Sequence, residues 1–256
     1  MSKDIKCFGR CWPRRKFLKV IGGVAVGTLA LASGIVWVRR AGKKSVYELG
    51  QDKVVEYQKL SRPKIEELLG VENYDRCCAA MLKEYDEFAP RLPIFDDESN
   101  RGQFLRSAPF MLSLYRTLLG EFAFSQDKAL DLLSQITCFK VRKDYEENRT
   151  IETFFYARMA KSEFFRDLGM KRMVYQDEKY GWAVEFPESD AYIAMDYTRC
   201  GLVDWFRDQG VPEIAPVACE GDLIWAEYFT GLEFRRTKTI AGGDDICDFR
   251  YVKEQA

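Results

Sequence analysis

Apolar side chains recur at intervals of three and four residues through the first half of the chain, the spacing of one face of an α-helix. From Glu72 onward this stripe predicts a helix that ends at the Pro-Arg-Leu-Pro run of residues 90–93. Its apolar positions are Tyr74, Cys77, Cys78, Met81, Leu82, Tyr85 and Phe88. Cys77 and Cys78 lie on or beside the stripe, so we interpret both as small buried side chains.

Three more helices are predicted after this one. Acids at 96–98 open a helix that runs to Gly120, with a kink at Pro109. Ser125 stands at the N-cap position of a third helix, on which Cys138 is a packing residue. A fourth helix is predicted over 151–168, and Gly169 is expected to end it.

The apolar period changes to two after residue 180, which is typical of β-strands. Four strands are predicted, at 182–186, 191–197, 234–240 and 247–252. Two short helices, 201–209 and 219–229, separate the two pairs of strands, and a turn-rich segment at 241–245 joins the last two strands as a hairpin. This order indicates an α+β fold, in which an N-terminal helical layer packs on a mostly antiparallel sheet.

The first 44 residues have a different pattern. The sequence Arg-Arg-Lys-Phe-Leu-Lys at 14–19 precedes a glycine-rich apolar run from Val20 to Val38. This arrangement is similar to a twin-arginine export signal. The run has 19 residues, so it is also long enough for an uncleaved helix across a bilayer core of ~30 Å. The alternative is an ordinary single-span anchor in which the arginines are incidental. The export signal makes the twin-arginine export machinery a partner, and both interpretations place the body on a bacterial cytoplasmic membrane or beyond it, on the periplasmic or extracellular side.

The rest of the chain is divided by the same reasoning. Residues 45–70 are polar and loosely patterned, and we expect a linker with one or two short helices and a boundary at Pro63. Residues 71–256 are then expected to form the functional α+β domain.

Charge and composition exclude some functions. The chain holds 39 Lys and Arg and 40 Asp and Glu, and residues 1–44 contain eleven of the bases but one of the acids. The remaining body therefore has a net charge of −11, which argues against nucleic acid as a partner. The chain contains no histidine, so any catalysis must rest on side chains such as Cys, Asp, Glu, Lys or Arg.

The C-terminal quarter holds the densest group of such side chains. Its motifs are Cys200, Gly-Val-Pro-Glu at 210–213, Cys219-x-x-Asp222, Arg236-Thr-x-Thr-Ile-Ala-x-Gly243, and Cys247-Asp248-Phe249. With these motifs and the helical stretches 82–93 and 103–120, the body resembles the L-2-amino-thiazoline-4-carboxylic acid hydrolase family over roughly residues 75–250.

The resemblance implies hydrolysis of a cyclic carbon–nitrogen bond in a small-molecule substrate. The amidine-like carbon of a thiazoline ring is attacked, and the ring opens to a carbamoyl amino acid. As catalytic residues we predict Cys219, Asp222 and Cys247. Cys219 would be a thiolate nucleophile, because the positive end of a helix dipole lowers the pKa of a thiol at the helix start. Asp222, in the same first turn, would hold the amidinium or steer a water molecule.

Three further residues are predicted to bind the substrate. Arg236 would clamp its carboxylate through two hydrogen bonds. Asp248 would face the same pocket as Cys247, and Gly243 would let the backbone approach the ligand closely. Each residue also has a structural explanation: Arg236 as an edge charge, Gly243 as a turn glycine, and the cysteines as core residues.

Other interpretations of the same residues stay open. No cofactor is expected in the thiol mechanism, but Cys200, Cys219 and Cys247 are alternative ligands for zinc, which would activate a water molecule. Two of these cysteines could instead pair as a structural disulfide after export. The alternative function is that of a non-catalytic, membrane-anchored accessory or ligand-binding subunit.

Overall fold

The computed structural model describes residues 5–7, 10–12, 44–96, 98–148, 150–172 and 179–254. The chain divides into two compact units, Met1–Ser45 and Val46–Ala256. In the first unit, β1 (Ile5–Cys7) and β2 (Arg10–Trp12) pair as an antiparallel hairpin. The twin-arginine-like sequence and the apolar run Val20–Val38 lie outside the described residues. Within the described ranges, no helix is both long enough and apolar enough to cross a membrane.

The second unit begins with a long helix, α2 (Val46–Leu69), where a linker was expected. The helix continues through Pro63, although proline cannot donate the usual backbone hydrogen bond. Val54, Tyr57 and Ile65 are almost completely buried on both sides of this position. The predicted linker and its boundary at Pro63 are therefore wrong, because tertiary packing of α2 outweighs the weak local pattern.

The next three helices follow the apolar stripes of the sequence. They are α3 (Tyr74–Phe88), α4 (Glu98–Gly120) and α5 (Gln126–Asn148), with short 3-10 turns at Val71–Asn73 and Ala89–Arg91. Ser125 caps α5 as predicted, since its hydroxyl accepts the backbone N–H of Lys128 at 3.3 Å. Cys77 is fully buried and Cys78 half-buried, which confirms their packing role.

The predicted fourth helix is divided in two, α6 (Thr150–Lys161) and α7 (Glu163–Arg172). Gly169 lies inside α7 and does not end a helix. A Cβ atom at this position would overlap the side chain of Met159 on α6. Gly169 is thus explained by the close approach of α6 and α7.

The C-terminal half forms a four-stranded antiparallel sheet in the order β3-β4-β6-β5. The strands are β3 (Ala183–Glu185), β4 (Ile193–Arg199), β5 (Leu232–Arg235) and β6 (Cys247–Lys253). Met195 lies opposite Phe249, and Tyr197 opposite Cys247, so these four side chains share the inner face. The predicted α+β class is confirmed, as is the hairpin of the last two strands.

Two short helices lie between the strand pairs, as predicted, but the second begins earlier than expected. They are α8 (Gly201–Asp208) and α9 (Ala215–Ala226), with 3-10 turns at Pro212–Ile214 and Ile240–Gly242. Gly210 follows α8 with a φ of 75°, a conformation that glycine adopts without strain.

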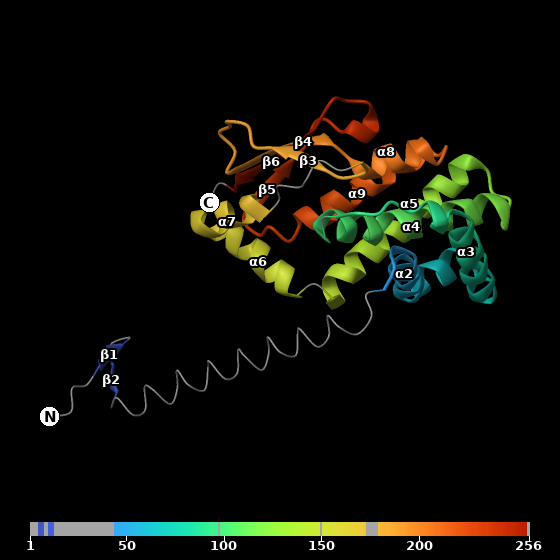
Figure 1. Cartoon of the computed structure of the whole chain (residues 1–256), viewed down its shortest axis with the longest axis horizontal. Helices are drawn as coiled ribbons and strands as arrows, with labels where there is room; N and C mark the ends of the chain where they lie inside the picture. Colours follow the sequence, from blue (N-terminus) through green and yellow to red (C-terminus); the bar gives the residue numbers. More distant parts are fainter. Residues whose placement is uncertain are drawn as a thin grey trace. The chain divides into compact units, whose positions relative to one another are not determined.

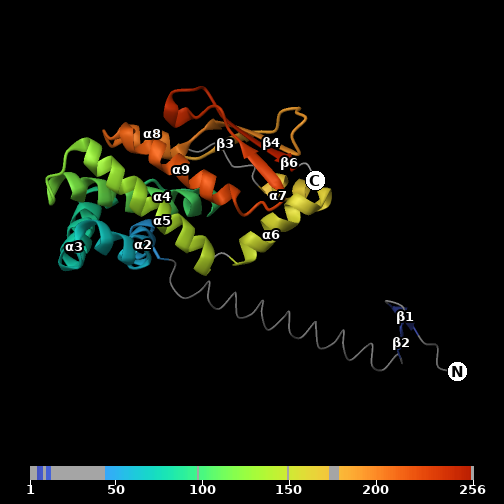
Figure 2. The same ribbon diagram turned by 180° about the vertical axis from the view of Figure 1, so that it is seen from behind.

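Two hydrophobic clusters form the core of this unit. The larger cluster joins α2–α5 with α8, and Trp205 packs edge-on against Phe88 and Phe104 within it. The smaller cluster lies between the sheet, α6 and the end of α9, around Phe229 and Tyr251. Figures 1 and 2 show α2–α5 at one end of this unit and α6 and α7 beside the sheet at the other, with α9 running between them.

Candidate active site

A pocket of about 240 Å³ lies where the helical layer meets the sheet. Its walls come from α4, α5 and α6, from the start of α8, from α9, and from the inner face of β4 and β6. Pockets for drug-sized ligands measure roughly 300–1,000 Å³. This pocket therefore suits a smaller molecule.

Four of the residues singled out in the sequence line this pocket: Cys200, Cys219, Asp222 and Cys247. Cys200 immediately precedes α8, Cys219 and Asp222 lie on α9, and Cys247 opens β6. The antiparallel sheet brings these elements together, because the start of β6 pairs with the end of β4. The chain then leaves β4 and enters α8, so Cys247 lies near the start of α8.

Cys219 does not lie at the start of its helix. Helix α9 begins at Ala215, so Cys219 is in its second turn and its own N–H is engaged within the helix. The favourable effect of a helix dipole falls off within the first turn. The predicted reason for a low pKa at Cys219 is therefore wrong, and Asp222 is likewise a mid-helix residue.

The pocket thiols are protonated near neutral pH. Burial raises the pKa of the Cys219 thiol well above its usual range, and the neighbouring Asp222 carboxylate raises it further. Burial also raises the pKa of Cys200 to about 12, and it raises that of Cys247. A neutral thiol is a poor nucleophile, so these side chains present mainly soft, weakly polar surface to the pocket.

Asp222 differs from the thiols, because its carboxyl has a pKa close to neutral pH. Burial raises the pKa of this carboxyl to about 7, although the adjacent Arg236 favours its charged form. The side chain lines the pocket and is 36% exposed there. A carboxyl that titrates near pH 7 can take up and release a proton at little cost.

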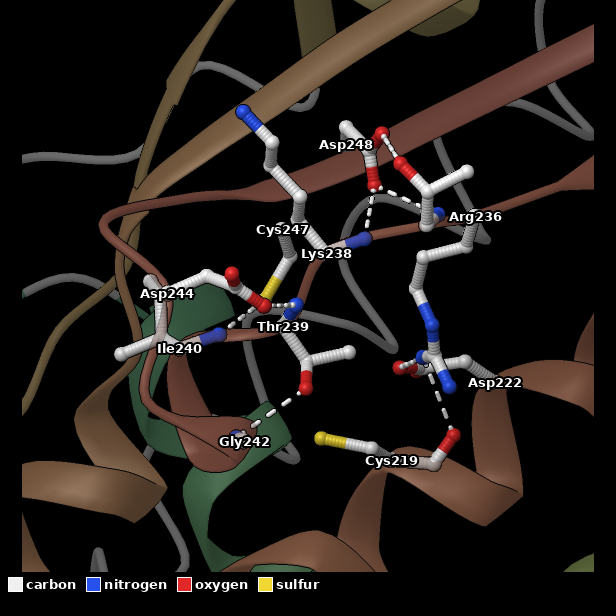
Figure 3. Close-up of polar contacts among 11 residues, drawn as sticks. Cys219, Asp222, Arg236, Lys238, Thr239, Ile240, Gly242, Asp244, Cys247 and Asp248 are labelled. Atoms are coloured by element: carbon white, nitrogen blue, oxygen red, sulfur yellow. Dashed lines mark hydrogen bonds and ion pairs between the residues drawn. The ribbon is translucent and has the colours of Figure 1, made fainter.

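Arg236 is bound to the protein itself. Its Nη1 donates to Asp222 Oδ2 at 2.8 Å and to the carbonyl oxygen of Cys219 at 3.1 Å. Its side chain is only 12% exposed, and the guanidinium lies over the ring of Phe249, 5.6 Å from the centroid. In Figure 3, the Cys219 carbonyl faces Arg236 while its sulfur points to the other side. Arg236 follows β5 and does not line the pocket, which leaves it poorly placed for the predicted clamp on a substrate carboxylate.

Asp248 and Gly243 serve the loop that follows Arg236. Asp248 accepts hydrogen bonds from the backbone N–H groups of Thr237 and Lys238, at 2.8 and 2.6 Å, and from the Thr237 hydroxyl at 2.6 Å. Gly243 ends the Ile240–Gly242 turn with a φ of 102°. Neither residue lines the pocket, so their placement supports a structural role for both. Figure 3 shows the hydrogen bonds of Asp248.

Sequence reasoning missed the contribution of the helical layer. Arg106 on α4 and Lys140 and Asp144 on α5 line the pocket. Lys140 and Asp144 are 2% and 8% exposed, one helical turn apart. Charges that are buried to this extent are rarely without function. In the sequence they interrupt an apolar stripe, so the pattern favours exposed positions for them. Aromatic side chains complete the walls, namely Tyr145, Tyr156, Trp182, Tyr197, Trp225 and Phe249.

The alternative roles of the cysteines find no geometric support. Throughout the ranges that the structure describes, no three Cys, Asp or Glu side chains are grouped as a metal site. Among these described residues, Cys200, Cys219 and Cys247 are not grouped in that way, and none of them is paired with another cysteine.

Comparison with known families connects this pocket to one group of hydrolases. A family model described as L-2-amino-thiazoline-4-carboxylic acid hydrolase matches residues 103–251. The matched range begins on α4 and ends on β6, so it includes all the elements that line the pocket. Comparisons with curated proteins and with solved structures gave no significant match.

Proposed function

The chain belongs to the L-2-amino-thiazoline-4-carboxylic acid hydrolase family, and from this premise we propose that it hydrolyses a small cyclic amidine that carries a carboxylate. The pocket supports this class of substrate by its size and by its lining. It is small, its aromatic walls suit a flat ring, and it contains both basic and acidic side chains.

The proposed reaction adds one water molecule across a ring carbon–nitrogen bond. The water oxygen bonds to the amidine carbon, and one water proton passes to a base. The ring nitrogen takes up this proton, the second water proton passes from the added hydroxyl to the same nitrogen, and the ring C–N bond breaks to release an amine. The amidine carbon becomes the carbonyl of a carbamoyl group, so no oxidant or reductant is consumed.

We assign the base to Asp222, and the observation that carries the proposal is its position: the carboxyl lines the pocket and is held by Arg236 at 2.8 Å. Burial raises the pKa of this carboxyl to about 7, which suits the role. Its ionised form can accept the proton of the attacking water, and its protonated form can then donate to the leaving nitrogen. Arg236 acts through Asp222: it fixes the carboxylate by the 2.8 Å ion pair and keeps the pKa from rising further.

A water mechanism fits the site better than attack by a thiolate. The predicted nucleophile Cys219 has a raised pKa, and formation of its thiolate beside the Asp222 carboxylate is opposed by charge repulsion. Catalytic thiolates lie in electropositive surroundings. We propose that Cys219 contributes to the shape of the pocket as a neutral thiol.

Two substitutions in the full chain separate these mechanisms. Asp222→Asn keeps the size of the side chain and removes the base, so kcat with L-2-amino-thiazoline-4-carboxylate should fall roughly 10²- to 10⁴-fold. Cys219→Ser should change kcat less than about tenfold. The assay follows disappearance of the thiazoline and appearance of the carbamoyl product.

Controls make the result interpretable. Asp131→Asn, on the exposed face of α5, makes the same chemical change far from the pocket and should leave kcat unchanged. Circular dichroism checks that each variant is folded. If Cys219→Ser is as inactive as Asp222→Asn, the thiol is the nucleophile and our assignment is wrong. If the wild-type protein turns over neither this compound nor a hydantoin, the proposed function itself is wrong.

A further inference from the structure

Two arginines lie close to the pocket, and they differ in what they bind. Arg236 is already paired with Asp222 and with a main-chain carbonyl, as described above. Arg106 lines the pocket directly from α4. Within the described ranges it forms no ion pair, and its one hydrogen bond is from Nε to the carbonyl oxygen of Gly102 at 3.2 Å.

This hydrogen bond fixes one edge of the Arg106 guanidinium. Since Nε is held by the preceding turn of its own helix, the two terminal nitrogens, Nη1 and Nη2, keep their donors for another group. A guanidinium offers pairs of parallel N–H donors that match the two oxygens of a carboxylate. Arg106 is half-buried, so a carboxylate bound to it would be partly shielded from water.

The surroundings of Arg106 add to its positive character. Lys140, on the neighbouring helix α5, donates from Nζ to the main-chain carbonyl of Arg106 at 3.0 Å. Its ammonium also lies 4.4 Å from the centroid of the Tyr57 ring, within the core. The wall built by α4 and α5 thus carries two cations, Arg106 and Lys140, and one carboxyl, Asp144; among the described residues Arg106 forms no ion pair.

We infer that Arg106 binds the carboxylate of the substrate and thereby orients its amidine carbon towards Asp222 on α9. The inference rests on the proposed function and specifies it: the substrate class is a small ring with a carboxylate, recognised from the helical layer. It also replaces Arg236 as the carboxylate receptor. Arg106 is thus a specificity residue that contacts the substrate at a distance from the reacting bond.

The test compares two substrates on two variants of the full chain. One substrate is L-2-amino-thiazoline-4-carboxylate, and the other is 2-amino-2-thiazoline, which has the same ring without the carboxylate. Wild-type protein should prefer the carboxylate by roughly 10- to 100-fold in kcat/KM, the usual effect of a hydrogen-bonded charge pair. Arg106→Gln should lose this preference, mainly through a higher KM, while kcat/KM for the carboxylate-free ring changes less than about threefold.

Matched variants distinguish recognition from folding. Arg101→Gln, on the same helix but paired with Glu98 and outside the pocket, should keep the wild-type preference. Arg106→Lys keeps the charge but loses the paired donors, and it should recover part of the preference. This variant also remains informative if Arg106→Gln fails to fold.

Failure of the inference and failure of the proposed function look different. If wild-type protein turns over both rings equally well, the function stands and the role of Arg106 is wrong. If it turns over neither, quenching of the pocket tryptophans, Trp182 and Trp225, still reports binding. If wild-type protein then binds the ring with the carboxylate more tightly than the ring without it, and Arg106→Gln abolishes this difference, the inference is supported. Equal binding of the two rings, or no binding, would overturn it.

Discussion

In the proposed mechanism, the neighbouring side chains of Asp222 and Arg236 divide a catalytic task between them. The carboxyl lines the pocket and titrates near neutral pH, whereas the guanidinium is withdrawn from the pocket and bound to α9. Burial and ion pairing shift the pKa of Asp222 in opposite directions, and burial is the larger effect. In the proposed mechanism, the balance between burial and ion pairing sets the pH at which Asp222 becomes an active base.

The pH dependence of turnover should follow from this balance. The base is the ionised form of Asp222, so kcat/KM should rise with pH and level off above about 7. Arg236→Gln removes the charge that lowers the pKa, and the rising limb should move upward by roughly 1–3 pH units. Rate profiles between pH 5 and 9 measure this shift.

A neighbouring arginine provides the control for this experiment. Arg235→Gln removes a guanidinium that is paired with Glu233 on the surface, and the pH profile should not move. Arg236→Lys should restore part of the shift, because it restores the charge. If the rising part of the pH profile of kcat/KM does not move in Arg236→Gln, Asp222 does not control the pH dependence.

At the scale of elements, the loop between β5 and β6 is ordered by a few side chains. Asp248 accepts two main-chain N–H groups and one hydroxyl, Thr239 accepts the N–H of Gly242 at 3.0 Å, and Asp244 accepts the N–H of Thr239 at 2.8 Å. The loop begins at Arg236, so these hydrogen bonds also fix the main chain of the arginine whose side chain holds Asp222. A short hairpin connection without these bonds would leave that arginine free to move.

Asp248→Ala should therefore destabilise the fold by about 1–2 kcal/mol, the usual effect of losing hydrogen bonds to a charged group that is partly exposed. Burial opposes ionisation of Asp248, but the hydrogen bonds from Thr237 and Lys238 prevail and lower its pKa. Its contribution is hence present at neutral pH and should be lost as the pH falls below about 4. Urea unfolding at pH 7 and pH 3.5 measures both effects.

Asp245 lies exposed in the same loop and supplies the matched variant. Asp245→Ala should change the free energy of unfolding by less than about 0.5 kcal/mol. An equal effect of the two substitutions would mean that loop charge, and not the hydrogen bonds of Asp248, accounts for the stability.

At the scale of the molecule, the pocket lies between the two hydrophobic clusters. Leu202 and Ala215 belong to the helical cluster, Cys247 and Phe249 belong to the sheet cluster, and all four line the pocket. Helix α9 contributes to both clusters, through Val217 near its start and Ala226 at its end. A bound ligand would therefore contact both halves of the core at once.

Ligand binding should stabilise both clusters together. At a ligand concentration 100 times the Kd, the free energy of unfolding should rise by about 2.7 kcal/mol. Asp222→Asn should slow turnover at least about 100-fold, so L-2-amino-thiazoline-4-carboxylate itself can serve as the ligand. Hydrogen exchange resolved by segment should show added protection in α4 and in β6. Protection confined to one of them would mean that the ligand does not bridge the two clusters.

Much of this architecture could be predicted from the local pattern. The apolar stripes located α3, α4 and α5, the alternation located β3 and β4, and Ser125 was identified as a cap, because these features depend on residues close together in the chain. Helix boundaries were less well determined. Pro63 and Gly169 suggested ends where the helices continue, since packing against distant residues overrides the local preference.

The sequence by itself determined the fold class and the family, and it singled out Cys219, Asp222 and Arg236 as candidate site residues. Only the tertiary structure decided where these side chains lie and what they contact. It placed Cys219 in the second turn of α9, bound Arg236 to Asp222, and brought Arg106 from the helical layer into the pocket. The physical reason is that periodicity and motifs record local geometry, whereas burial, pKa and pairing depend on groups that approach each other only when the chain folds.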